Sequence, residues 1–308
     1  QLAIPNLQSG PSMSEIQIER STYEGWEECI RITNGLVELV ATTAVGPRIV
    51  DFRRTDGENV FFLDESAAGT IGDDGWELYG GHRLWHSPEH DPRTYQPDNE
   101  PVDATVTERG CRLVQPVETE TGIQKAIEIK MAEDEPAVEL THELTNEGVW
   151  SVELAPWAIS VCKPGGTAVV PFPDGDPDKL LPDRSLVFWP STDIGDDRLS
   201  YVDDHVLVEQ ADGPELKIGA NALEGWTAYV NDGQAFVKTF DHDPERTYPD
   251  RGASVEAFML DFMLELETLG PLVELDPDET TSHTERWHLF DGVSQPDDGA
   301  DAATLAPE

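Results

Sequence analysis

Three chemically capable side chains stand within four residues of one another in the segment Gly80–Trp85. His82 titrates near neutrality and could donate a proton, whereas Arg83 is a permanent donor suited to hydroxyl, carboxylate or phosphate groups. Trp85 offers an aromatic face on which a sugar ring can stack. The glycine pair before them lets the backbone turn sharply and approach a ligand. The segment therefore predicts a ligand-binding cleft, although Arg83 could instead pair with a structural acid and Trp85 could belong to the core.

Glu265 and Glu267 form a second chemically capable group. They are two residues apart in a segment that reads as a strand, so both point to one face, and their neighbours are apolar. Adjacent carboxylates that are partly desolvated raise one pKa toward the operating range of a general base. The pair is a candidate for proton abstraction, although a solvent-facing strand of a very acidic protein would show the same pattern.

The spacing of His82, His86 and Glu89 raises the question of a metal site. On a helix the two histidines would share one face, as they do in many metal sites. The glycine pair and Pro88 argue against a regular helix here. We therefore expect no metal.

The chain carries 62 acidic and 20 basic residues, which gives a formal net charge of −42. The acids are spread along the sequence, so no single cation-binding patch is indicated. Such a carboxylate sheath repels itself in dilute buffer and is screened at high salt. We expect a protein from a salt-accumulating halophile, with an ordinary acidic protein as the alternative. A nucleic-acid partner is excluded because phosphate contacts need a basic surface.

The cysteines and the hydropathy pattern bear on location. Cys29, Cys111 and Cys162 are odd in number and far apart, so reduced thiols in a cytoplasm are expected. No apolar run approaches the roughly 18 residues of a membrane span, and the N-terminus lacks a signal-peptide pattern. We therefore expect a cytoplasmic protein with no membrane partner.

Period-two alternation dominates the sequence, and sustained helical periodicity is scarce. Turn residues separate the alternating runs, as in a sandwich or a barrel. Asn34-Gly35 is a typical hairpin turn. The expected strands are Ile16–Arg20, Cys29–Thr33, Leu36–Ala41, Ile49–Arg53, Val102–Thr107, Arg112–Gln115, Ile123–Met131, Ala137–Leu144, Trp150–Ala158, Ala168–Pro171, Leu186–Trp189, Tyr201–Glu209, Glu215–Gly219, Trp226–Val230, Gln234–Phe240, Val255–Glu267 and Thr280–Phe290.

The chain is expected to form one domain over residues 14–292. Residues 1–13 would be an extension or an expression remnant, and residues 293–308, rich in Asp, Ala and Pro, a disordered acidic tail. Residues 69–100 and 172–200 break the strand rhythm. Long irregular stretches inside a domain are often functional loops, so the chemistry is expected there.

Three passages resemble the galactose-mutarotase-like superfamily, the sandwich shared by aldose 1-epimerases and hexose-6-phosphate epimerases. They are Trp76–Glu89, Leu154–Gly166 and the region from Phe262 through His283 to Leu289. The similarity covers about residues 30–290 and is greatest to the branch with a Gly-Gly-His-Arg-Leu-Trp motif. It implies an all-β fold, a large antiparallel β-sandwich.

The resemblance also implies an activity, the opening and reclosure of a sugar ring at its anomeric carbon. The family places its carboxylate base on a late strand, which implies Glu265 or Glu267. The family's acid is usually a histidine, but the matching position here is Trp157. The acid would then be His82 or His142, although His142 also reads as a hydrogen-bonded core residue.

The resemblance implies a small-molecule sugar as partner and no cofactor, and we expect a monomer or a homodimer. The side chains expected to bind the sugar are Arg83, Trp85, His86, Glu89, Tyr95, Asn99, Trp157, Arg48 and Lys163. Two alternatives stay open because a fold does not fix a function. One is a non-catalytic carbohydrate-binding or regulatory sandwich, and the other is a lyase or hydrolase on the same fold.

Overall fold

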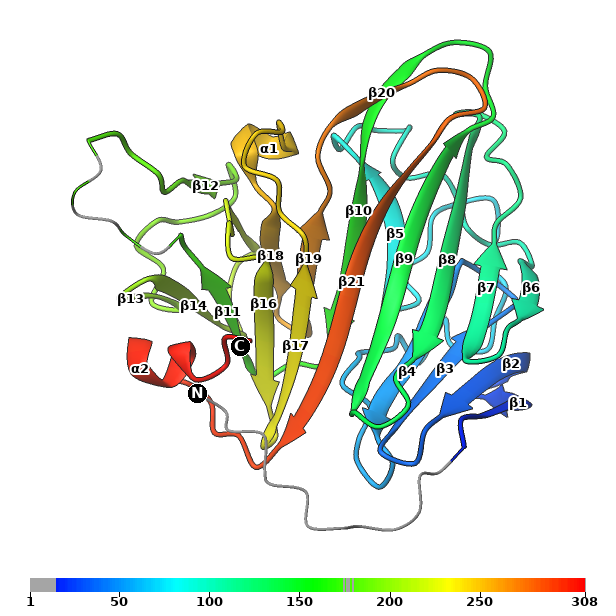
Figure 1. Ribbon diagram of the computed structural model, residues 1–308, viewed down its shortest axis with the longest axis horizontal. Helices are drawn as coiled ribbons and strands as arrows, with labels where there is room; N and C mark the ends of the chain where they lie inside the picture. Colours follow the sequence, from blue (N-terminus) through cyan, green and yellow to red (C-terminus); the bar gives the residue numbers. More distant parts are fainter. Residues whose placement is uncertain (1–14, 174, 176–177, 179, 308) are drawn as a thin grey trace.

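Alternating apolar and polar residues form strands through most of the computed structural model, which describes residues 15–173, 175, 178 and 180–307. The expected extension at residues 1–13 lies outside the described residues. The strands make two large sheets, and all the strand pairs found in them are antiparallel. The two sheets face each other, with β9 and β21 passing in front of β5 and β10 in Figure 1. The predicted large antiparallel β-sandwich is confirmed.

The first sheet has eleven strands. In spatial order they are β1 (Gln17–Tyr23), β2 (Trp26–Thr33), β3 (Val37–Thr42), β4 (Arg48–Arg54), β5 (Gly81–Ser87), β10 (Val152–Cys162), β19 (Met263–Leu269), β18 (Val255–Leu260), β15 (Leu216–Ala220) and β12 (Leu186–Phe188), while β20 (Val273–Leu275) pairs with one end of β10.

The second sheet has ten strands. In spatial order they are β13 (Leu199–Val202), β14 (His205–Glu209), β11 (Thr167–Pro171), β16 (Trp226–Asn231), β17 (Gln234–Phe240), β21 (Thr280–Asp291), β9 (Ala137–Asn146), β8 (Ile123–Met131), β7 (Gly110–Val114) and β6 (Asp103–Val106).

The apolar core lies between the two sheets. Phe52 of β4, Phe236 of β17 and Trp287 of β21 meet there with ring centroids 5.3–6.0 Å apart. Edge-to-face contacts of this kind stabilise a core beyond the area that they bury. The interior is therefore rigid enough to position the side chains on the opposite face of the first sheet.

A buried polar network crosses this core. Lys238 of β17 and Glu285 of β21 are both fully buried, and their Nζ and Oε1 atoms are 3.0 Å apart. Lys238 also donates to the carbonyl of Leu266 in β19, at 3.0 Å, so its ammonium joins the two sheets. Thr268 and Trp287 donate to Glu285 as well. The buried charges are therefore compensated by several hydrogen bonds.

The Gly80–Trp85 segment is not an irregular loop, because Gly81–Ser87 forms the central strand β5. The glycine pair makes the predicted turn, but the close approach is to neighbouring backbone rather than to a ligand. Gly80 and Gly81 have φ of 87° and 71°, and a Cβ on either would lie 2.2–2.3 Å from the carbonyl oxygen of Phe62 or Ile49. Only glycine allows this turn and close approach at the start of the strand.

Two short helices accompany the sheets, α1 (Pro249–Gly252) and α2 (Gly299–Ala303). The C-terminal segment, for which the sequence predicts disorder, differs from that expectation. Asp298 caps α2, and Ala302 and Leu305 are buried against the outer face of the second sheet. The alanines and leucine of this acidic segment give it an apolar face. None of the helices in the described part of the chain is long and apolar enough to span a membrane.

The Lys238–Glu285 pair gives a stability prediction. Lys238→Met should lower the free energy of unfolding by about 3–5 kcal/mol, because it leaves Glu285 buried without its cation. Lys238→Met combined with Glu285→Gln should recover most of the loss. Urea unfolding followed by tryptophan fluorescence measures both variants. Arg20→Met, in the exposed pair with Glu28, is the control and should change little. Equal losses in Lys238→Met and Arg20→Met would contradict the assignment.

Candidate functional site

A cavity of about 380 Å³ opens on the face of the first sheet that is turned away from the core. The alternation along each strand explains this arrangement, because Leu84 of β5 and Leu266 of β19 enter the core between the sheets. Their neighbours Arg83 and Glu265 therefore point the other way, and both line the cavity.

Strand register collects the charged side chains on this floor. In one row across the sheet, Arg83 pairs with Ile159, Ile159 with Glu267, and Glu267 with Glu256. In the next row, Glu265 pairs with Phe258, and Phe258 with Lys217. Four strands from three separate parts of the sequence (β5, β15 and the β18–β19 hairpin) therefore bring two cations and three carboxylates together.

Aromatic side chains form the walls of the cavity. Trp85 and Trp157 sit opposite each other on β5 and β10, with ring centroids 5.5 Å apart. Trp76 and Tyr95, from the segments before and after β5, pack at 5.6 Å and 5.0 Å from Trp85. Trp189 completes the lining on the side of β15. This site is apolar with a few polar groups, as ligand sites generally are.

Glu265 is the carboxylate that reaches the cavity from β19. It is 6% exposed and accepts a hydrogen bond of 3.0 Å from Nη2 of Arg83. Arg83 lies over the Trp85 ring at 4.5 Å, and its Nε and Nη1 are buried without a protein partner. Burial raises the pKa of Glu265; Arg83 opposes this shift and Glu267 adds to it. Glu265 is thus a suitable proton acceptor beside unused hydrogen-bond donors.

Glu267, predicted as the alternative base, is fully buried behind the wall of the cavity. Its Oε2 accepts from Nε1 of Trp157 at 2.7 Å and from Nζ of Lys217 at 3.1 Å. It therefore positions these two residues, whereas Glu265 faces the cavity. The structure distinguishes two carboxylates that the sequence pattern could not separate.

The structure does not place His82 in the cavity. As a neighbour of Arg83 on a strand, it points into the core, where it is fully buried. His142 Nδ1 donates to the carbonyl of His283, so its Nε2 accepts from His82 Nε2 at 2.7 Å. His82 Nδ1 then accepts from Ser160 at 2.9 Å. Both histidines are core residues, and the prediction of His82 as the acid is corrected.

Four other predicted ligand-binding residues also lie elsewhere. His86 is on the core face of β5, beside Glu118 at 3.6 Å. Arg48 is fully buried and bridges Asp98, at 2.7 Å, and the carbonyl of Gly80. Asn99 holds the loop before β5 through Tyr79, Asp73 and Gly75, and Lys163 lies near Glu58 in a different depression. By contrast, Arg83, Trp85, Glu89, Tyr95, Trp157 and Glu265 all line the cavity.

Sequence reasoning missed several lining residues, above all Lys217, Trp189 and Glu215. Lys217 of β15 and Glu215, which directly precedes β15, are two residues apart, a pattern that the expected strand Glu215–Gly219 contained. Nothing in the sequence showed that β15 lies three strands away from β10. Trp76 was part of the recognised passage, but no binding role was assigned to it.

One group of described residues has the composition of a metal site. The ligand atoms of His82, His142 and Glu285 lie within 4.8 Å of one another. However, the two imidazoles hydrogen-bond each other, and Lys238 pairs with Glu285. The His82–His86 spacing considered in the sequence does not form a metal site either, because four residues along a strand separate the two histidines by about 13 Å. The group is a structural network.

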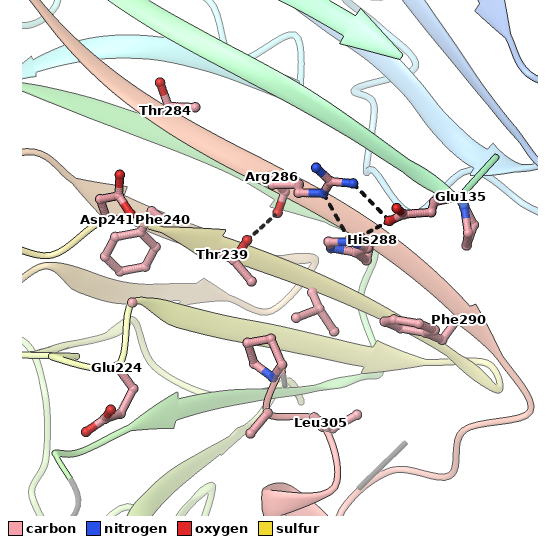
Figure 2. Close-up of a pocket in the computed structure, with 15 residues that line it drawn as sticks. Glu135, Glu224, Thr239, Phe240, Asp241, Thr284, Arg286, His288, Phe290 and Leu305 are labelled. Carbon is pink, nitrogen blue, oxygen red and sulfur yellow. Dashed lines mark hydrogen bonds and ion pairs between the residues drawn. The ribbon is translucent and has the colours of Figure 1, made fainter. Parts of the chain in front are cut away.

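A larger cavity, of about 610 Å³, lies on the outer face of β17 and β21, beside the C-terminal segment. Figure 2 shows Arg286 and His288 directed toward Glu135 rather than into the cavity, and Arg286 Nη2 is 2.9 Å from Glu135 Oε2. Arg286 and His288 are thus engaged with Glu135. The 380 Å³ cavity, where polar groups converge, is the better candidate.

The environment of Glu265 gives a pH prediction. Its pKa should lie above the ordinary value of 4.5, because burial disfavours the carboxylate. Arg83→Met should raise the pKa further, because the guanidinium favours the ionised form. A ¹³C NMR titration of the glutamate side chains, assigned with Glu265→Gln, measures both values. An unchanged or lower pKa in Arg83→Met would contradict this geometry.

The fold resembles that of solved structures, although the sequence itself matches little. No family model matches the sequence, and no curated protein is significantly similar. Among solved structures, a galactose mutarotase-like protein from Lactobacillus casei matches with a TM-score of 0.55 and 8% identity, over 85% of this chain and 100% of that chain. A second such protein, from Clostridium acetobutylicum, matches with a TM-score of 0.55 and 11% identity, over 90% and 99%.

A TPR-domain containing protein from Parabacteroides distasonis also matches, with a TM-score of 0.56 and 13% identity over 88% of this chain. The present chain spans only 49% of that protein. At such identities the similarity concerns the fold alone. The chain has the β-sandwich fold of the galactose mutarotase-like proteins.

Proposed function

We propose that this protein binds a sugar in the tryptophan-lined cavity and interconverts the anomers of that sugar, as an aldose 1-epimerase-like isomerase. The observation that carries the proposal is the meeting of Glu265 and Arg83 with Trp76, Trp85 and Trp157 in one cavity of about 380 Å³. Aromatic faces suit the apolar side of a pyranose, and the charged groups suit its hydroxyls.

Glu265 would be the general base of this reaction. Its carboxylate faces the cavity, and its raised pKa brings it closer to the operating pH of a base. It would take the proton of the anomeric hydroxyl while the bond from the anomeric carbon to the ring oxygen breaks. Arg83 would orient the sugar through its unpartnered Nε and Nη1. The similarity in fold to mutarotase-like proteins supports this reaction class.

A second candidate function is sugar binding without catalysis. It is favoured by one observation: among the described residues, no histidine lines the cavity. A module of this kind would keep the aromatic wall and Arg83 but would not exchange protons with the sugar. This second function predicts that the same sugars bind but that the rate of anomer exchange is not accelerated.

The cellular setting is also a proposal. The 62 acidic residues and the three free, buried cysteines support a reducing, salt-rich cytoplasm. Assays of the protein should therefore include molar KCl.

Glu265→Gln separates the two functions. The wild-type protein should accelerate anomer exchange for at least one aldose of a panel, measured by NMR magnetisation exchange and polarimetry. Glu265→Gln should lower that rate by about 10²–10⁴-fold, the usual contribution of a general base. Its sugar affinity, measured by tryptophan fluorescence, should change only a few-fold. Glu274→Gln, at an exposed glutamate of β20, is the matched control and should keep full activity.

The outcomes are distinct. Binding by the wild type without accelerated exchange would establish the second candidate. Full activity in Glu265→Gln would overturn the assignment of the base. A wild-type protein that neither binds nor exchanges any aldose in the panel would overturn both functions.

A further inference from the structure

Lys217 is the cation that faces the cavity from β15, and its surroundings are specific. The side chain is almost completely buried, yet it contributes to the lining of the cavity. Its Nζ lies 2.8 Å from Glu256 Oε2 and 3.1 Å from Glu267 Oε2, both of which are fully buried behind it. The ammonium therefore stands between two carboxylates and the space that a ligand would occupy.

Two aromatic rings fix the ammonium in this position. Nζ is 4.5 Å from the ring centroid of Trp157 and 4.8 Å from that of Trp189. Trp157 is held in turn by its hydrogen bond to Glu267. An ammonium has three N–H donors. One of them donates to Glu267, whereas the contact with Glu256 is an ion pair, so donor capacity remains for a ligand oxygen.

The described residues that line the cavity offer few alternatives for a proton donor. Arg83 does not give up its proton in proteins. The hydroxyl of Tyr95 already donates to Glu89. Among the cations and hydroxyls of the described lining, Lys217 remains as the proton carrier, and it reaches the cavity from the opposite end of the Glu265–Phe258–Lys217 row.

We propose that Lys217 is the proton donor to the ring oxygen, in the role that a histidine would otherwise have. This inference rests on the proposed anomer interconversion. It adds to that proposal a second catalytic residue on the opposite side of the sugar from Glu265.

The step balances without any further reactant. Glu265 takes the proton of the anomeric hydroxyl, and the electron pair of that O–H bond forms the carbonyl of the open-chain aldehyde. The bond from the anomeric carbon to the ring oxygen breaks, its electron pair stays on that oxygen, and Lys217 supplies the proton. After rotation of the aldehyde group, Lys217 takes its proton back, Glu265 returns the other, and the ring closes as either anomer.

The electrostatics of Lys217 retain its proton and make it a weak acid, so the step depends on the basicity of the oxygen that receives the proton. Burial alone would lower the pKa of its ammonium, but Glu256 and Glu267 raise it above the ordinary value, so the proton is present in the resting site. The oxygen that leaves the anomeric carbon develops alkoxide character and is strongly basic. A preorganised ammonium stabilises such developing charge before it gives up the proton.

The experiment compares variants of Lys217 by NMR exchange with the aldose that the wild type converts. Lys217→Met should lower kcat by about 10²–10⁴-fold. Lys217→Ala should be rescued by methylammonium in a saturable manner. Tetramethylammonium, which has the same charge but no N–H, should not rescue it. Sugar affinity, measured separately by fluorescence, should change much less than kcat.

Lys125→Met is the matched control for the loss of a buried lysine. Lys125 of β8 is also buried, and it pairs with Glu118 at 2.5 Å on the core side of the second sheet. This variant should lose stability, as Lys217→Met does, but keep its kcat. A stability effect alone would reduce the active fraction of both variants by similar amounts.

Three results would overturn the inference. Near-normal kcat in correctly folded Lys217→Met would remove the donor role and leave Glu265 and the proposed function intact. Equal rescue by methylammonium and tetramethylammonium would show that only charge is needed. A wild-type protein without exchange activity would overturn the proposed function and this inference together.

Discussion

The two-sided nature of a strand is the constraint on which the rest of this structure depends. β5 runs between β4 and β10, and each of its faces is covered. Neighbouring residues must therefore serve different environments. His82 belongs to the interior, whereas Arg83 and Trp85 belong to the cavity. The same rule places Leu266 in the core and its neighbours Glu265 and Glu267 on the other side of β19.

The charges on the cavity side need compensation, because few of them contact water. Glu256 and Glu267 share one ammonium, that of Lys217, and Glu265 shares the guanidinium of Arg83. Burial raises the pKa of Glu256 well above its ordinary range, although Lys217 opposes the shift. Such a cluster costs folding free energy that a purely apolar sheet would not, and groups of this kind concentrate at functional sites.

The fold could be predicted from the sequence to a large extent, because strand alternation and turn residues are local signals. β8, β9 and β17 begin at the expected residues. The site was predicted only in part. Arg83 and Trp85 follow from their residue types, and the resemblance points to Glu265 without separating it from Glu267. Lys217 and Trp189 reach the cavity through strand order, which no local pattern encodes.

Two other errors have local causes. The glycine pair marked a turn, and nothing showed that the turn ends at Gly81, where β5 begins. The C-terminal segment reads as disordered because its composition is rich in charged residues. Ala302 and Leu305, however, are spaced to share one face of a helical turn, and that face is buried. A count of residue types over the segment does not show this spacing.

The cavity is built from two kinds of parts. Its floor belongs to paired strands, where Arg83, Glu265 and Lys217 are held by the hydrogen bonding of a whole sheet. Trp76 and Tyr95 belong to the segments that flank β5, whose pairing is limited to isolated bridges. A change in either flanking segment would therefore alter the wall of the cavity and, through the contact of Trp76 with Arg83, its floor as well, while the strand pairing of the sheet stays in place.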